Sequence, residues 1–231
     1  MGRETSPEET VKAAKRTGCQ SIAYTYTEPT IFMEYAYDTA KLAVENGLRN
    51  VFVTNCYITE EALKEIAPYL HAANIDLKSF SDRFYQETCG AQLEPVLKAI
   101  KLHKKLGIWI EVTTLIIPTL NDSEENLFEI AEFIADVGVE IPWHVSGFYP
   151  AYQLLDLPPT PIETIRKAKN IGVKAGLRYV YQGNVPEEEE NTYCYHCGEL
   201  LIERFGYRIV KNTIIESACP RCGAVIDDVL K

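Results

Sequence analysis

The sequence lacks a long apolar run, an apolar segment near its start and an excess of positive charge. Its longest apolar runs, such as residues 115–118, are far shorter than the ~20 residues that cross a bilayer. The first ten residues contain no apolar signal segment, so we expect a cytoplasmic protein. Lys and Arg number 23 against 33 Asp and Glu, a formal net charge of −10. This charge disfavours binding to nucleic acid through a general basic surface.

The 231 residues are 46% hydrophobic and 24% charged, a composition typical of one large globular domain with a small appendage. Ser6, Asp122 and Thr160 each precede a glutamate by three residues, which predicts three helix N-caps. Helices of this kind alternate with short β-branched or aromatic segments, which predicts βαβ units and a parallel sheet. The predicted strands are 21–26, 50–54, 74–78, 108–117, 142–148 and 178–182.

Six strands are too few for a closed (β/α)₈ barrel. The fold class is therefore α/β, with a partial (β/α)₆ TIM-type barrel as the first choice and a doubly wound sheet as the second. We place the barrel at residues 1–183. An acidic linker follows at 184–192, where four consecutive glutamates interrupt the apolar pattern. A separate small module is predicted at 193–231.

That small module contains two C-x₂-C-G units separated by 21 residues. Their cysteines are Cys194, Cys197, Cys219 and Cys222. The spacing lets both thiolates of a pair reach one ion, and four thiolates suit a closed tetrahedral site. The sequence predicts a Cys₄ zinc ribbon, and it leaves open iron on the same ligands.

Polar residues follow most of the predicted strands. They are Thr27 and Glu28, followed by Pro29, after the first strand, Thr54 and Asn55 at the end of the second, Asp76 and Lys78 on the third, and His144 on the fifth. Because ligands bind at the carboxyl ends of strands in βα folds, this pattern predicts a small-molecule site. Structural roles remain open: a helix cap for Glu28, a buried ion pair for Asp76 and Lys78, and a core position for His144.

With these residues in view, the chain resembles the radical S-adenosylmethionine (SAM) enzymes related to pyruvate formate-lyase activating enzyme. It is most similar to the AmmeMemoRadiSam-system radical SAM protein. The resemblance rests on YTYTEPTIF (24–32), VTNCYI (53–58), NIDLKSFSDRFY (74–85), EVTTLIIPTLNDSEENL (111–127), PWHVSGFYP (142–150) and LRYVYQGNVP (177–186). It implies a partial barrel that holds SAM in its mouth, and a 4Fe–4S cluster that reduces the SAM sulfonium.

The resemblance also implies roles for individual residues. Thr27, Glu28 and Pro29 match the element that holds the methionine amino group, and Thr54 and Asn55 fall near the methionyl end. Asp76 and Lys78 match a D-x-K element in which Lys78 suits the methionine carboxylate. His144 matches a position near the ribose.

The chain departs from the family in one important respect. The family holds its cluster with a C-x₃-C-x₂-C run after the first barrel strand, and this sequence contains no such run. Cys19, Cys56 and Cys89 are not spaced to replace it. We therefore predict a barrel without its first strand, no catalytic residue in this chain and no activity alone.

The expected partners are an unknown protein substrate or a missing N-terminal segment, and strand 21–26 is expected to be an open edge for self-association. Two other functions remain open. One is a lyase that uses Lys78 as an amine nucleophile. The other is a non-catalytic scaffold or interaction protein that uses its zinc ribbon.

Overall fold

The computed structural model describes residues 4–185, 190–206 and 208–227. The chain forms two compact units. The first consists of Met1–Asp76 with Gln92–Glu111, and the second of Leu77–Ala91 with Val112–Lys231. None of the helices in these described ranges has the length and apolar character needed to cross a membrane.

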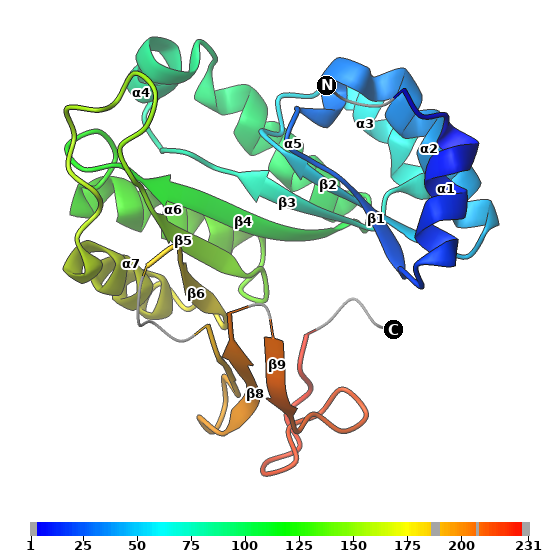
Figure 1. The fold of residues 1–231 in the computed structure, drawn as a ribbon. Helices are drawn as coiled ribbons and strands as arrows, with labels where there is room; N and C mark the ends of the chain where they lie inside the picture. Colours follow the sequence, from blue (N-terminus) through cyan, green and yellow to red (C-terminus); the bar gives the residue numbers. More distant parts are fainter. Residues whose placement is uncertain (1–3, 186–189, 207, 228–231) are drawn as a thin grey trace. The chain divides into compact units, whose positions relative to one another are not determined.

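Six strands form one sheet, and their order in the sheet is their order in the sequence (Figure 1). The strands are β1 (Ser21–Tyr24), β2 (Arg49–Thr54), β3 (Ala72–Asp76), β4 (Trp109–Ile116), β5 (Trp143–Gly147) and β6 (Val180–Gly183). The pairs β1–β2, β2–β3, β4–β5 and β5–β6 are parallel. A doubly wound sheet reverses its strand order at a switch point, whereas this order never reverses. The partial (β/α)₆ architecture is thereby confirmed over the doubly wound alternative.

One helix precedes β1, and the other helices lie in the connections between strands, as parallel pairing requires. They are α1 (Pro7–Arg16), α2 (Met33–Glu45), α3 (Glu60–Ile66), α4 (Asp82–Phe84), α5 (Leu93–Lys105), α6 (Glu124–Val137) and α7 (Ile162–Lys174). Short turns η1 (Pro29–Phe32), η2 (Ala67–Tyr69) and η3 (Tyr85–Cys89) complete the connections. A second, three-stranded sheet consists of β7 (Thr192–Tyr193), β8 (Leu200–Phe205) and β9 (Arg208–Asn212).

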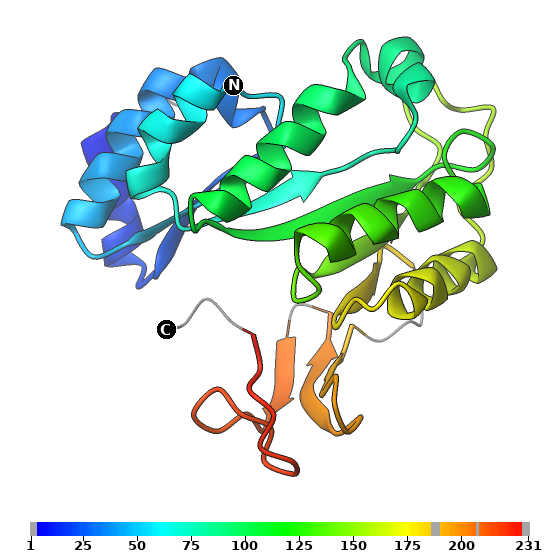
Figure 2. The same ribbon diagram turned by 180° about the vertical axis from the view of Figure 1, so that it is seen from behind.

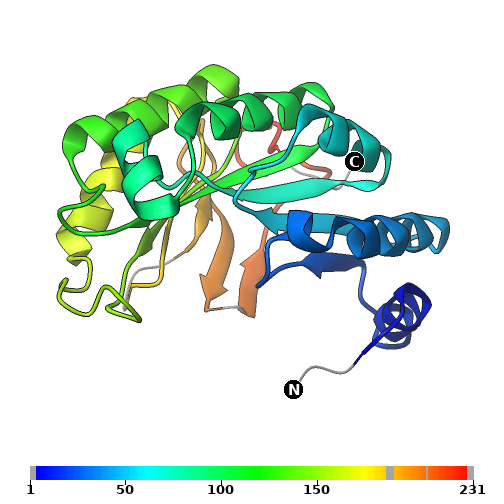
Figure 3. The ribbon, with the colours of Figure 1, turned by 90° about the horizontal axis from the view of Figure 1, so that it is seen from above.

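In the first unit, α1 packs beside α2, and α2 runs along β1 and β2 (Figure 3). Val11 of α1, Ala43 of α2 and Leu48 form the buried apolar contact. A polar contact lies deeper. The buried Asn50 side chain donates to the carbonyls of Ala40 and Tyr69, each at 2.9 Å. These bonds tie β2 to its two flanking helical segments, because a buried amide without partners would be costly.

In the second unit, α6 and α7 lie side by side, and α7 covers β5 and β6 (Figure 2). Trp143 of β5 is completely buried, and its indole Nε1 donates to Thr114 Oγ1 at 2.9 Å. Gly172 of α7 faces this ring. A Cβ atom at Gly172 would lie 2.8 Å from Trp143 Cε3, closer than such atoms approach, so the close helix requires glycine here.

Of the three predicted helix N-caps, the structure confirms one. Ser6 forms the expected capping box with Glu9. Ser123, and not Asp122, caps α6 by accepting from Asn126 N–H. Asp122 instead accepts from Thr119 N–H. Thr160 is buried and caps nothing, because its hydroxyl donates to Ile116 O and accepts from Phe148 N–H. Both failures have the same cause: a neighbouring strand or turn competes for the capping side chain.

We expect stability to depend on pH through His103, which lies on α5 and is 1% exposed. Burial lowers the pKa of its imidazole, although a hydrogen bond to Ala99 O opposes this shift. In the unfolded chain the pKa returns to about 6.5. The unfolded state therefore binds more protons below that pH, so the free energy of unfolding falls as pH drops below about 6.5.

Urea unfolding between about pH 5.5 and 7.5 tests this expectation, because His103→Gln should flatten the slope of stability against pH. The pKa of His71 is also lowered, first by burial and then by the positive charge of Arg49. Because His71 is only half-buried, His71→Gln should flatten the slope less than His103→Gln does. An unchanged slope in His103→Gln would contradict the assignment.

Candidate metal centre and cofactor site

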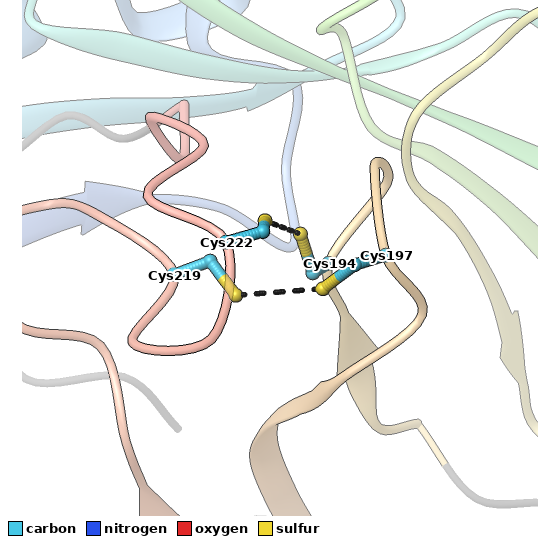
Figure 4. Close-up of side chains that lie close together, drawn as sticks. All are labelled: Cys194, Cys197, Cys219 and Cys222. Carbon is cyan, nitrogen blue, oxygen red and sulfur yellow. Dashed lines mark hydrogen bonds between the residues drawn. The ribbon is translucent and has the colours of Figure 1, made fainter.

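The four ribbon cysteines converge on one point (Figure 4). Their sulfur atoms all lie within 4.8 Å of one another. Cys194 and Cys222 are separated by 3.6 Å between Sγ atoms, and Cys197 and Cys219 by 3.7 Å. A tetrahedral ion with sulfur at about 2.3 Å places its ligands about 3.8 Å apart. The predicted four-cysteine metal site is therefore confirmed as a geometric site for one ion.

Two similar turns present these sulfurs. In the first, Gly198 N–H donates to Cys194 O at 2.9 Å, and in the second, Gly223 N–H donates to Cys219 O at 2.9 Å. Both glycines have a positive φ, +73° and +74°, a conformation that other residues adopt only at a cost. The glycine after each C-x₂-C pair is thus what lets the chain curl around the ion.

The centre is partly buried and favours ionisation of one thiol. Cys194 and Cys219 are buried, whereas Cys222 is exposed. Burial opposes ionisation of Cys219, but backbone N–H groups of Cys222 and Arg221 and neighbouring thiols outweigh it and lower the Cys219 pKa to about 7. A thiolate is the form that binds metal.

The ribbon shares its core with the last strand of the barrel. Tyr179, just before β6, is buried in one cluster with Cys194, Leu201, Cys219 and Ile226. Arg178 also forms a 2.8 Å ion pair with Asp227 near the end of the described chain. Residues 186–189 of the predicted linker lie outside the described residues. Its last two residues, Asn191 and Thr192, are buried. Packing therefore continues across the boundary that the sequence suggests at residue 193.

A second group of predicted residues assembles at the ends of β1 and β2. Glu28 accepts from the Thr54 hydroxyl at 2.6 Å and from Asn55 N–H at 2.7 Å. It also caps η1 by accepting from Thr30 N–H. Pro29 is buried at the start of η1, while Thr27 is exposed. The structural role and the site role of Glu28 are compatible, because the bonds from Thr30 and Thr54 end on Oε1, and Oε2, which accepts from Asn55 N–H, has a second lone pair for a ligand.

Lys78 lies beyond the strand on which the sequence predicts it. β3 ends at Asp76, and Leu77 is the last residue to bond the backbone of β4, through its N–H to Thr113 O at 3.0 Å. The Tyr85 hydroxyl oxygen accepts a hydrogen bond from the Lys78 backbone N–H at 3.1 Å. The Asn121 side chain donates to Lys78 O at 2.6 Å. These two bonds position the Lys78 backbone.

Sequence reasoning did not select Asn121 as a functional position. This buried side chain bonds three backbone groups: it donates to the carbonyls of Lys78 and Leu115 and accepts from Ile117 N–H. The buried Asn126 side chain accepts from the Ser79 hydroxyl and from Phe80 N–H, and it donates to Asn121 O. The two asparagines of the NDSEEN segment (121–126) are the only sequence feature that could have indicated these roles. Polar residues beside the start of a helix are equally typical of helix caps, so the feature is ambiguous.

His144 stacks on Tyr181, a residue at the end of the last predicted strand that is not among the predicted cofactor contacts. The rings are 5.3 Å apart between centroids with an interplanar angle of 25°. The two residues are partners in the β5–β6 register, so their side chains leave the sheet on the same face.

The cysteines outside the ribbon do not fit an iron–sulfur cluster. In the part of the chain that the structure describes, the ribbon cysteines are the only group of three or more residues that could share a metal ion. Cys56 is completely buried beside His103, with 3.7 Å between Sγ and Nδ1, and burial raises its pKa. A neutral buried thiol is a poor cluster ligand.

Fold and sites together define an α/β protein of the partial-barrel class with a four-cysteine metal site. The family model of the radical SAM superfamily matches residues 1–134. The chain belongs to the radical SAM superfamily, and it is related to pyruvate formate-lyase-activating enzyme.

The chain is similar to several individual proteins. An uncharacterized protein of Methanocaldococcus jannaschii is 51% identical over 232 residues, which cover 99% of this chain and 69% of the relative. The pyruvate formate-lyase-activating enzyme of Clostridium pasteurianum is 26% identical over 180 residues, 73% of this chain and 75% of that enzyme. The crystal structure of a domain of pyruvate-formate lyase-activating enzyme from Bacteroides vulgatus superposes with a TM-score of 0.59 at 20% identity, covering 71% of this chain and 98% of that domain.

The purified protein should contain about one metal ion per chain, bound by the ribbon. Cys194→Ser should lose it, whereas Cys19→Ser, at an exposed cysteine outside the ribbon, should keep it. With free metal at about a thousand times its Kd, the lost binding should cost roughly 4 kcal/mol of unfolding free energy. Metal analysis and urea unfolding measure both effects. Equal metal content in the two variants would refute the site.

Proposed function

We propose that this chain binds S-adenosylmethionine as part of a radical SAM enzyme of the activating-enzyme type, and that its ribbon holds a structural zinc ion. The observation that carries the proposal is the assembly of Glu28, Thr54 and Asn55 at the ends of two neighbouring strands, in a chain that belongs to this family. The full set of proposed SAM contacts is Thr27, Glu28, Pro29, Thr54, Asn55, Asp76, Lys78 and His144.

The chemistry of these residues suits an amino acid joined to a nucleoside. SAM supplies the adenosyl group that the family uses in hydrogen abstraction. The Glu28 carboxylate is held in one orientation by its two bonds to the second strand, so it is ready to accept from an ammonium group. Lys78 supplies the cation for a carboxylate, and its backbone is fixed by Tyr85 and Asn121.

Zinc is the proposed ion of the ribbon because four thiolates with no open position form a structural site. Iron on the same four sulfurs would bind with similar geometry. Metal analysis of protein purified without added metal distinguishes the two.

We expect Lys78→Ala to weaken SAM binding. A hydrogen bond between charged groups contributes about 1.5–3 kcal/mol, so the affinity should fall at least about tenfold. Lys41→Ala, at an exposed lysine of α2, is the matched control and should bind as the unmodified chain does. Isothermal calorimetry with SAM provides the measurement. Equal affinities for Lys78→Ala and the control would remove Lys78 from the site.

We also propose that residues 1–183 of this chain do not hold a 4Fe–4S cluster and do not generate a radical alone. The support is the absence of a C-x₃-C-x₂-C run from the 231 residues and the burial of Cys56.

Anaerobic reconstitution with iron and sulfide tests that proposal. Zinc-loaded protein is the correct starting material, because the ribbon cysteines share a core with Tyr179 and their replacement would disturb the barrel. With zinc retained, we expect no reducible cluster signal in electron paramagnetic resonance. A 4Fe–4S signal that disappears in Cys56→Ser would overturn the proposal.

A further inference from the structure

Tyr181 connects the metal ribbon to His144. Its ring stacks on His144 within the barrel, and its hydroxyl lies 2.9 Å from Thr192 Oγ1 at the start of the ribbon. The side chain therefore touches both the candidate cofactor site and the module that contains the metal centre.

The ribbon holds the Tyr181 side chain through a charged residue as well. Arg204 of β8 donates through Nη1 to Thr192 Oγ1 at 2.7 Å and to Glu190 O at 2.8 Å. Its guanidinium carbon lies 5.7 Å from the centre of the Tyr181 ring, within the range of a cation–π contact. Arg204 thus fixes Thr192 and covers Tyr181 at the same time.

The positions of Thr192 and Arg204 depend on the metal centre. Thr192 is two residues before Cys194, whose N–H donates to Glu199 O at 2.8 Å and closes the first metal-binding turn. β7 and β8 then pair on either side of this turn, with Thr192 opposite Ile202. Small metal-binding modules fold when the ion binds, so removal of the ion loosens the sheet that presents both residues.

We propose that Tyr181 is a positioning residue through which metal binding at the ribbon sets the orientation of His144. The metal-bound ribbon holds the Tyr181 hydroxyl, and the stacked Tyr181 ring holds the imidazole. The contact between His144 and SAM rests on the proposed function. With that contact, bound metal increases the affinity of the chain for SAM, and bound SAM increases its affinity for the metal, because coupling between two sites is reciprocal.

The four histidines of the chain provide the test. In the metal-loaded protein, histidine labelled at Cε1 gives one Cε1–H resonance for each of His71, His103, His144 and His196. His196 lies between two metal ligands and reports the ion directly. His71 and His103 lie in the other compact unit and serve as internal references. Removal of the ion with a chelator should shift the His196 and His144 resonances and leave the other two in place.

Tyr181→Phe keeps the stacked ring and removes the hydroxyl. In this variant the chelator should still shift His196, but the shift of His144 should be lost or strongly reduced. Arg204→Gln should act in the same way. Tyr193→Phe removes a hydroxyl from the exposed side chain next to Cys194 and is the matched control, with the response of the unmodified chain.

Any of three results would overturn the proposal. The chelator could shift the His196 resonance without shifting that of His144, or it could shift His144 in Tyr181→Phe as much as in the unmodified chain. The third such result is a loss of the His144 shift in the control Tyr193→Phe. If the chelator unfolds the whole protein, all four resonances move. The metal-loaded variants then decide, because Tyr181→Phe and Arg204→Gln must each move His144 while Tyr193→Phe must not.

Calorimetry with SAM separates this inference from the proposed function. In metal-loaded protein, Tyr181→Phe should bind SAM about 2- to 10-fold more weakly, and it should have no further effect in a His144→Ala background. An unmodified chain that binds no SAM would refute the proposed function and leave the resonance experiment to decide the coupling. SAM binding that is unaffected by Tyr181→Phe would refute the coupling alone.

Discussion

Parallel pairing of neighbouring strands is the constraint on which two groups of candidate residues depend, one in each compact unit. Parallel strands end at the same sheet edge, so residues that follow two neighbouring strands meet there. The β1–β2 pair brings Glu28 within hydrogen-bond distance of Thr54 and Asn55. The β5–β6 pair places His144 directly beside Tyr181. In each pair, residues about 26 to 37 positions apart come into contact without any local sequence signal.

The site relies on buried polar groups that bond backbone as well as on the residues that face a ligand. Asn50 holds β2 to two helical segments, and Asn121 holds the backbone of Lys78. Each is buried and fully engaged, so its replacement would leave several backbone groups without partners. A rigid backbone of this kind reduces the ordering that a ligand must impose when it binds.

The metal ribbon is joined to the barrel by packing as well as by the chain. Tyr179 belongs to the ribbon core, and Arg178 pairs with Asp227 beyond the second metal-binding turn. Loss of the ion therefore removes support from β6, the strand that also presents Tyr181. A metal ion bound by the four cysteines would therefore support β6 through this packing as well as its own module.

The sequence alone determined the α/β class, the six strands, the four metal ligands and the capping box at Ser6, because each depends on spacing within a short segment. Only the tertiary structure decided the role of a side chain that bonds a residue far away in the sequence. Thr160 bonds Ile116 instead of capping α7, β3 ends before Lys78, and Tyr181 joins His144 to the ribbon. Such choices depend on contacts between residues far apart in the chain, and local propensity contains no information about them.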